Sequence, residues 1–149
     1  MNHPVSSLPA LAALLPHSAP MILLDAVTRA DTTRVECSVR LSERDPFMVE
    51  GRVRSAVCLE YMAQAIGAFV GLARRARGLA PQIGYIVGVR SLKLSGPALS
   101  IGDDLIVSAE LTWSDIETAT FEASVECAGE QIAQGQITVY QPTEPGAVS

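Results

Sequence analysis

The sequence predicts an α+β fold in which one long buried helix packs against a curved antiparallel sheet of about six strands. Residues 54–78 form a stretch of helical length that is apolar on almost every side, and Glu60 is the only formal charge between Ala56 and Ala73. Segments on both sides of this stretch alternate polar and apolar side chains, as strands with one buried face do. Because a helix that is apolar on every face must be covered, we expect the sheet to wrap around it.

The central helix carries its own end signals. Ser55 is a suitable N-cap, since its hydroxyl can accept a hydrogen bond from a first-turn amide, and Gly78 can adopt the left-handed conformation that ends a helix. The uncharged run from Tyr61 to Ala73 has about 13 residues and is too short for a bilayer, which needs about 20. Gly67 and Gly71, four residues apart, predict that the backbone of the surrounding sheet approaches the helix closely.

The chain before this helix is predicted to form a short helix, two strands and a loop. Residues 8–15 predict the short helix, with Ser7 as its N-cap. Residues 16–25 form a turn that leads into an apolar strand, and residues 34–41 alternate in the manner of a strand with one wet face. The polar loop 42–54 follows, and loops of this length often carry function.

Four further strands are predicted after the helix, at residues 83–94, 104–113, 118–127 and 132–140. Consecutive strands are expected to pair as an antiparallel meander, with the helix against its concave face. The inward face of the second of these strands is predicted to comprise Leu105, Val107, Ala109, Leu111 and Trp113.

Composition limits the classes of partner. The 149 residues fit a single domain over residues 1–149, with flexible ends at 1–7 and 142–149. A hydrophobic content of 48% and a charged content of 18% favour a dimer or higher oligomer that buries apolar surface between subunits. The net charge of −5 argues against nucleic acid as a partner.

The cysteines and the N-terminus indicate the compartment. Cys37, Cys58 and Cys127 are scattered without metal-ligand spacing, which is typical of core thiols in a reducing compartment. No Lys or Arg precedes Arg29 and prolines interrupt the early apolar residues, so we predict neither a signal peptide nor a membrane anchor, and expect the cytoplasm. No motif for a metal or a cofactor is present, and none is predicted.

Glu60 is the main chemical candidate. A carboxylate inside an apolar helix costs several kcal/mol to desolvate, so Glu60 is expected to pair with an arginine, to be protonated or to face a cavity. Arg74, Arg75 and Arg77 lie at the end of the helix, where they form a solvated rim or dock an acidic partner.

Two stretches resemble a known family. Residues 14–25, Leu-Leu-Pro-His-Ser-Ala-Pro-Met-Ile-Leu-Leu-Asp, are similar to the LLPHxxPxLLVD signature of the 3-hydroxyacyl-acyl-carrier-protein dehydratases, and residues 59–67, Leu-Glu-Tyr-Met-Ala-Gln-Ala-Ile-Gly, to their ExMAQxxG helix motif. The resemblance implies the hotdog fold, no cofactor, and substrates carried on the phosphopantetheine arm of an acyl carrier protein. Arg74, Arg75 and Arg77 are then expected to dock that carrier.

In that family, a histidine of one subunit removes the α-proton, and an acid on the central helix of the neighbouring subunit protonates the leaving hydroxyl. By position Glu60 matches the helix acid, and an apolar tunnel would raise its pKa and keep it an acid near neutral pH. Ser55 falls where the family has a glycine whose amide polarises the thioester carbonyl. We also expect substrate contacts from Ala56, Gln64 and Phe47.

The family's loop histidine is absent. Its loop has the pattern GHFPxxPxxPG, whereas residues 45–55 of this chain contain no histidine. His3 lies in the expected loose terminus. His17 has three interpretations: an imidazole that stabilises the turn beside Pro16, a relocated base, or a substrate contact without proton transfer. Asp45 either takes the place of the missing histidine or forms an Asp-Pro turn.

The histidine-free loop and the two motifs together resemble most closely the dehydratase-like proteins encoded with aryl polyene pigment biosynthesis, which act beside a second hotdog dehydratase. Three functions follow as hypotheses. The first is a dehydratase of fatty acid or polyene synthesis that forms the trans-2-enoyl thioester, with Glu60 and His17 as catalytic residues. The second is a half-site or non-catalytic partner subunit in a hetero-oligomer rather than a homodimer, and the third is an acyl thioesterase.

Overall fold

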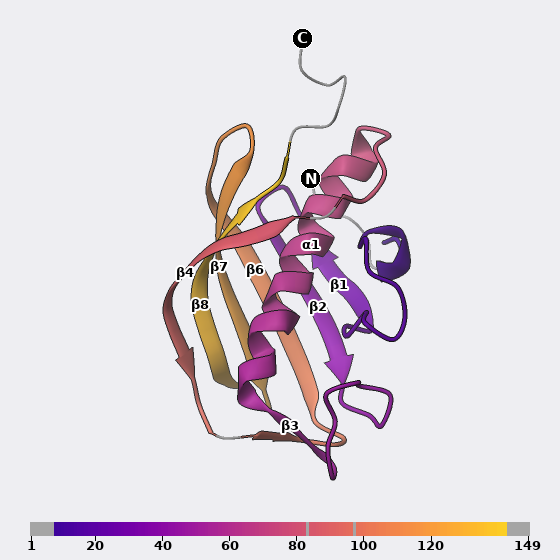
Figure 1. Cartoon of the computed structure of the whole chain (residues 1–149), viewed down its shortest axis with the longest axis vertical. Coiled ribbons are helices and arrows are strands. Elements are labelled where there is room, and N and C mark those ends of the chain that lie inside the picture. The colour runs from indigo at the N-terminus through magenta and orange to yellow at the C-terminus, as the bar shows by residue number, and fades with distance from the viewer. Residues whose placement is uncertain (1–7, 83, 97, 143–149) are drawn as a thin grey trace.

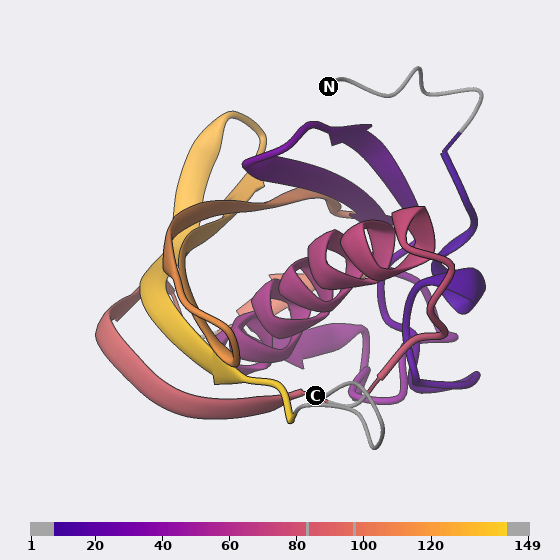
Figure 2. The same cartoon turned by 90° about the horizontal axis from the view of Figure 1, so that it is seen from above.

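The long helix α1 (Cys58–Ala76) lies on the concave face of a curved antiparallel sheet that wraps around it (Figures 1 and 2). The computed structural model describes residues 8–82, 84–96 and 98–142. The predicted α+β architecture is confirmed, because the sheet has six strands in the spatial order β1-β2-β6-β7-β8-β4. Their bounds are β1 (Ala26–Ala30), β2 (Arg34–Arg40), β4 (Tyr85–Leu94), β6 (Asp104–Ser114), β7 (Thr118–Cys127) and β8 (Glu130–Tyr140).

The core forms between α1 and the inner face of the sheet. Tyr61, Met62 and Ile66 of α1 are almost fully buried in one cluster with Val107 and Ile137 of the sheet. The ring of Phe69 meets that of Phe121 edge-on, with 5.4 Å between the ring centroids. The sheet therefore covers one apolar face of the helix, as the sequence predicted.

By length and composition alone, the helical stretch Ser55–Ala76 is able to cross a membrane. Its place in the fold gives it another role, because the curved sheet covers one side of it and supplies apolar partners that a bilayer would otherwise provide (Figure 2). The expectation of a core helix agrees with this arrangement.

The N-terminal end of α1 differs from the predicted one. The chain enters through a 3-10 turn, η3 (Ser55–Val57), and the helix begins only at Cys58. Ser55 lies inside that turn, and no side chain caps the helix at Val57, so the prediction of Ser55 as N-cap is wrong.

The C-terminal end of α1 follows the prediction. The amides of Gly78 and Leu79 donate to the carbonyls of Arg75 and Arg74, at 3.0 and 2.9 Å. Gly78 has a φ of +74°, so this is a Schellman motif, and Gly78 is confirmed as the residue that ends the helix.

Strand β4 occupies a different place from the predicted one. Only β6, β7 and β8 form a meander, and β4 pairs with the far side of β8 instead of with β6. The connection from β4 to β6 passes through β5 (Ala98–Ser100), which pairs with β3 (Arg52–Arg54) near the start of α1 (Figure 1). Because of this connection, β6 lies next to β2 in the sheet and not next to β4. The short strands β3 and β5 were not predicted, because three residues are too few to show an alternating pattern.

The first strand starts later than predicted. Residues 16–25 form irregular chain, and β1 begins after Asp25. Leu23 shows why, since its amide donates to the Gln64 side-chain oxygen on α1 at 2.9 Å instead of to a neighbouring strand. This segment has the apolar composition of a strand, but its backbone bonds to a helix side chain and not to a neighbouring strand.

Trp113 does not belong to the inner face of β6. The pairing of β6 with β7 shifts register between Leu111 and Trp113, which is the effect of a β-bulge. Beyond the shift Trp113 is 54% exposed, so its predicted burial is wrong.

Near the chain ends, the predicted helix at residues 8–15 is reduced to the 3-10 turn η2 (Leu11–Ala13). Its predicted N-cap Ser7, the rest of residues 1–7, and residues 143–149 lie outside the described residues. Pro142 was expected to be flexible, but its carbonyl accepts a hydrogen bond from Gln82 Nε2 at 3.0 Å, which ties it to the fold.

Gly67 and Gly71 lie against the N-terminal segment and not against the sheet. A Cβ added at Gly71 would overlap the carbonyl group of Leu14, and one at Gly67 would lie 2.9 Å from Leu15 Cδ2. The predicted close backbone approach is confirmed, but its partner was wrong. The missing side chains allow the chain around Leu14 to lie directly on α1.

Candidate active site

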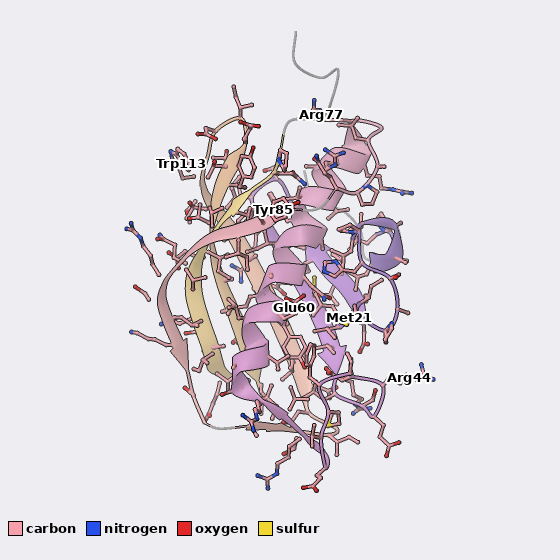
Figure 3. The ribbon with its side chains drawn as sticks, in the orientation of Figure 1. Met21, Arg44, Glu60, Arg77, Tyr85 and Trp113 are labelled. Atoms are coloured by element: carbon pink, nitrogen blue, oxygen red, sulfur yellow. The ribbon has the colours of Figure 1, made fainter. Side chains whose placement is uncertain are left out.

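An elongated groove of about 370 Å³ runs along one side of α1. Residues at three- and four-residue spacing from Glu60 to Arg74 form its helical side. The N-terminal segment forms one wall, and the start of β4 with the end of β8 forms the other. In Figure 3, Tyr85 of β4 lies closer to the C-terminal end of α1 than Glu60 does. The lining residues are Leu14, Pro16, His17, Glu60, Ala63, Gln64, Ile66, Gly67, Val70, Gly71, Arg74, Gln82, Gly84, Tyr85, Ile86, Val139 and Gln141.

Glu60 and His17 meet at one end of this groove. His17 Nε2 lies 3.8 Å from Glu60 Oε1, and the two side chains are 34% and 38% exposed, which places them at the mouth of the groove. His17 Nδ1 is buried and has no hydrogen-bond partner among the described residues. Within that part of the chain no hydrogen bond ties the imidazole to the turn beside Pro16. The turn-stabilising interpretation thus finds no hydrogen bond among the described residues, and a chemical role for His17 stays a prediction.

Gln64 orients Glu60 and fixes the chain that follows His17. Its Nε2 donates to Glu60 Oε1 at 3.1 Å and to the Met21 carbonyl at 2.7 Å, and its Oε1 accepts from the Leu23 amide at 2.9 Å. The side chain is almost fully buried. Gln64 lines the groove as predicted for a substrate contact, but its amide is committed to the protein and acts as a positioning group.

Packing of the N-terminal segment places His17. Leu11, Leu14 and Leu15 are buried in the main core, so this segment is an integral part of the molecule although it lies outside the sheet. The close contact of Leu14 with Gly71 brings the chain against α1 three residues before His17. The imidazole consequently reaches a carboxylate that lies far from it in sequence.

The model of the ApeP-like family, described as ApeP dehydratase, matches residues 9–149. The chain belongs to this family. A relative, the 3-hydroxyacyl-[acyl-carrier-protein] dehydratase FabZ of Chlamydia abortus, is 31% identical over 144 residues, which cover 91% of each protein. The resemblance to hotdog dehydratases and to their aryl polyene subgroup is thereby confirmed.

Solved structures confirm the hotdog fold of this ApeP-like chain. A chain of the dehydratase heterocomplex ApeI:P from Xenorhabdus doucetiae matches with a TM-score of 0.85 at 31% identity, over 91% of this chain and 93% of that one. Zebra fish thioesterase superfamily member 2 matches with a TM-score of 0.61 at 19% identity, over 85% and 86% of the two chains. At that identity the second match shows the fold alone.

In this ApeP-like chain, Asp45 anchors the loop before α1. Asp45 Oδ2 accepts a hydrogen bond from the Tyr61 hydroxyl at 2.7 Å, and Oδ1 accepts one from the Phe47 amide at 2.8 Å. Burial raises the pKa of Tyr61, and the hydrogen bond to the charged Asp45 raises it further, so the phenol stays protonated. Asp45 thus forms its Asp-Pro turn and does not line the groove beside Glu60.

Phe47, Ser55 and Ala56 do not line the groove either. Ser55 and Ala56 lie in the turn before α1, and Phe47 is 38% exposed in the preceding loop. The structure of one chain does not bring them to Glu60, so their contact with substrate stays a prediction.

Arg74 is poorly placed for carrier docking. It is only 9% exposed, its Nε donates to the Ala80 carbonyl at 2.7 Å, and its Nη1 donates to Gln82 Oε1 at 3.1 Å. Arg74 therefore lies inside the protein at the end of the groove remote from Glu60. Arg75 and Arg77 are exposed, and Figure 3 shows Arg77 at the outer end of α1.

Two groove residues had no signal in the sequence. Gln82 follows a loop proline, and Tyr85 belongs to a strand whose place in the sheet was wrongly predicted. Only the tertiary arrangement brings them to α1.

The described residues contain no cluster of three or more His, Cys, Asp or Glu that could hold a metal ion. The cysteines are free, and burial raises the pKa of Cys37 to about 12 and that of Cys58 to about 11. These two thiols are neutral core side chains at physiological pH.

Proposed function

We propose that this ApeP-like chain is a dehydratase subunit that converts a 3-hydroxyacyl thioester on an acyl carrier protein into the trans-2-enoyl thioester. The observation that carries the proposal is the pair of His17 and Glu60, 3.8 Å apart at the mouth of an apolar groove. The Chlamydia abortus relative bears the name of this enzyme. The groove suits the acyl chain, and the pair supplies a base and an acid next to the atoms that react.

Dehydration breaks the C2–H and C3–O bonds, forms the C2=C3 double bond and releases water. In the proposed reaction, the neutral imidazole of His17 removes the C2 proton, and the electrons of that bond form the double bond as the C3–O bond breaks. The carboxylic acid of Glu60 donates its proton to the departing hydroxyl, which leaves as water. The proton held by His17 then returns to Glu60. General acid–base groups of this kind contribute about 10²–10⁴-fold to rate.

The hydrogen bond from Gln64 supports these roles. It engages Glu60 Oε1, the same oxygen that lies nearest His17, and so holds the carboxyl group in one orientation. In the protonated acid, the other oxygen is then the one that can carry the proton toward substrate.

A second candidate function is a half-site subunit, in which Glu60 acts with the histidine of another hotdog protein. Strand β4 favours a partner, because it is an edge strand whose apolar side chains are 36–60% exposed. An exposed edge of this kind pairs readily with another strand. Tyr85 and Ile86 belong both to this edge and to the groove wall, so a partner on β4 would close the groove. The Xenorhabdus relative comes from a heterocomplex.

We also propose that Arg75 and Arg77 dock the acidic carrier protein and that the chain works in the cytoplasm. The thioesterase hypothesis gains no support beyond the fold, because the thioesterase relatives in the comparison share less than 25% identity with this chain.

The deciding experiment is mass-spectrometric detection of dehydration of a 3-hydroxyacyl carrier substrate. The chain alone would be compared with Glu60→Gln and His17→Gln, both checked for folding by circular dichroism. Turnover by the native chain that both variants lose supports the proposal. If only a mixture with a co-purified hotdog protein is active, and His17→Gln leaves that activity intact, the half-site function replaces it. No dehydration under either condition refutes both.

A further inference from the structure

The two ends of the groove differ in chemistry. Fourteen positions separate Glu60 from Arg74 on α1, which corresponds to about 21 Å at 1.5 Å per residue. Between Gln64 and Arg74 the lining is apolar, with Ile66 and Val70 from the helix and Val139 from the sheet. The Glu60 end carries the proposed catalytic pair, and the Arg74 end is lined by polar side chains that the proposed reaction does not use.

Hydrogen-bonded side chains line this end of the groove, here called the Arg74–Gln82 wall. Arg74 donates to the Ala80 carbonyl and to Gln82 Oε1, at 2.7 and 3.1 Å. Gln82 Nε2 donates in turn to the Pro142 carbonyl at 3.0 Å, and Gln141 Nε2 donates to the Gln82 carbonyl at 3.4 Å. The wall therefore ties the end of α1, the segment after it and the chain after β8 together across the groove.

Displacing this wall is costly. Arg74 is nearly buried, and a buried guanidinium separated from its hydrogen-bond acceptors keeps the full desolvation penalty of its charge. An alkyl chain that pushed against the wall would offer no acceptor in exchange. The wall is consequently a stop and not a flexible gate.

We propose that the Arg74–Gln82 wall sets the maximum length of the acyl chain, an inference that rests on the proposed function. The groove has a finite volume of about 370 Å³, so a chain whose thioester lies at Glu60 can extend along it only until it meets the wall. Each added methylene gains about fourfold in binding while it is buried against the apolar lining. That gain ends where the chain meets Arg74.

Two substitutions move the stop in opposite directions. Gln82→Ala removes the amide that holds Arg74 Nη1 and the Pro142 carbonyl, and so opens the wall. Val70→Phe fills the groove before the wall and shortens it. Gln131→Ala is the matched control, because Gln131 is exposed and does not line the groove.

The experiment measures kcat/KM for a series of 3-hydroxyacyl carrier substrates that lengthen by two carbons at a time. We expect kcat/KM of the native chain to rise with length and then to fall by about tenfold or more once the chain is long enough to reach the wall. Gln82→Ala should shift this fall to longer chains and Val70→Phe to shorter ones, while Gln131→Ala keeps the native profile. A profile without a fall, or a fall at the same length in all variants, overturns the inference.

The shortest substrate keeps the two proposals separate. Its turnover reports on the dehydratase function alone, since it does not reach the wall. If no substrate is turned over, calorimetric binding of unreactive acyl-pantetheine amides of the same lengths gives the profile directly. A length limit that moves with Gln82→Ala then still supports the wall, and an unmoved or absent limit refutes it.

Discussion

Gly71→Ala is the sharpest test of how the N-terminal segment places His17. A Cβ at this position would lie 2.9 Å from the Leu14 carbonyl carbon and closer still to its oxygen, whereas ordinary contact begins at 3.4 Å. The backbone of the segment must therefore retreat by more than about 0.5 Å. Such overpacking costs about 1–3 kcal/mol, and the better helix propensity of alanine returns up to about 1 kcal/mol.

Instead of shifting, the N-terminal segment could leave α1 altogether. The free-energy costs of these two responses decide which of them occurs. Leu11, Leu14 and Leu15 are each at most 3% exposed, so undocking them would cost about 1.5–3 kcal/mol per side chain. That sum exceeds the overpacking cost, and the segment should stay docked in a displaced position. We expect a net loss of unfolding free energy of about 0–3 kcal/mol, but a loss of about 100-fold in dehydration rate, as misplacement of a catalytic group by about 1 Å produces.

The measurements are urea denaturation and dehydration kinetics of Gly71→Ala beside Gly67→Ala. Gly67 is the matched control, because a Cβ there meets only the flexible end of the Leu15 side chain. We expect Gly67→Ala to stay within about fivefold of native activity, since a side-chain rotation relieves the contact. Equal activity of the two variants would contradict the argument that the backbone of the segment positions His17.

Three further predictions concern the surface and the core. Val87→Lys on the exposed edge of β4 should abolish oligomers in native mass spectrometry. Ile116→Lys is the control and should leave them intact, because Ile116 is 94% exposed on the β6–β7 hairpin. Intact oligomers of both variants would exclude the β4 edge as the interface. Reversal of Arg75 and Arg77 to Glu should weaken carrier binding about tenfold at low salt and less at high salt, and unchanged low-salt affinity would count against their docking role. Because burial raises the pKa of Cys37 from 9.0 to about 12, the unfolded chain ionises this thiol first. The contribution of this pKa difference to the free energy of unfolding is complete below pH 9. Above pH 9 it should decline by about 1.4 kcal/mol per pH unit, as measured by urea denaturation. Cys37→Ala should flatten that decline, and an unchanged slope would rule this thiol out as its source.

Sequence reasoning succeeded where the causes are local. The end of α1 at Gly78 follows from backbone conformation within one turn, and the predicted helix around Glu60 follows from a motif contained in one helix. Sequence reasoning failed where contacts between residues distant in sequence determine the structure. The apolar segment before Asp25 pairs with Gln64 across 41 residues, and no periodicity records such a contact.

The same distinction between local and long-range causes applies to the candidate site. Glu60 and His17 were both candidates from the sequence, and the structure brings them together, but their proximity depends on the docking of Leu14 at Gly71, which the sequence suggested only as a close approach of some backbone. Arg74 was assigned to the surface because arginines at a helix end are usually solvated. Its burial depends on the Ala80 carbonyl and on Gln82, which the turn after the helix brings back.

The separate origins of His17 and Glu60, the proposed catalytic pair, also affect how the protein would lose the proposed activity. Glu60 belongs to the helix enclosed by the sheet, whereas His17 belongs to a segment held outside the sheet by three leucines and the hydrogen bonds of Gln64. Such a segment can open in a local fluctuation that costs less free energy than global unfolding. Activity therefore reports on the docked state of the N-terminal segment, and inactivation by heat or denaturant should precede the collapse of the sheet.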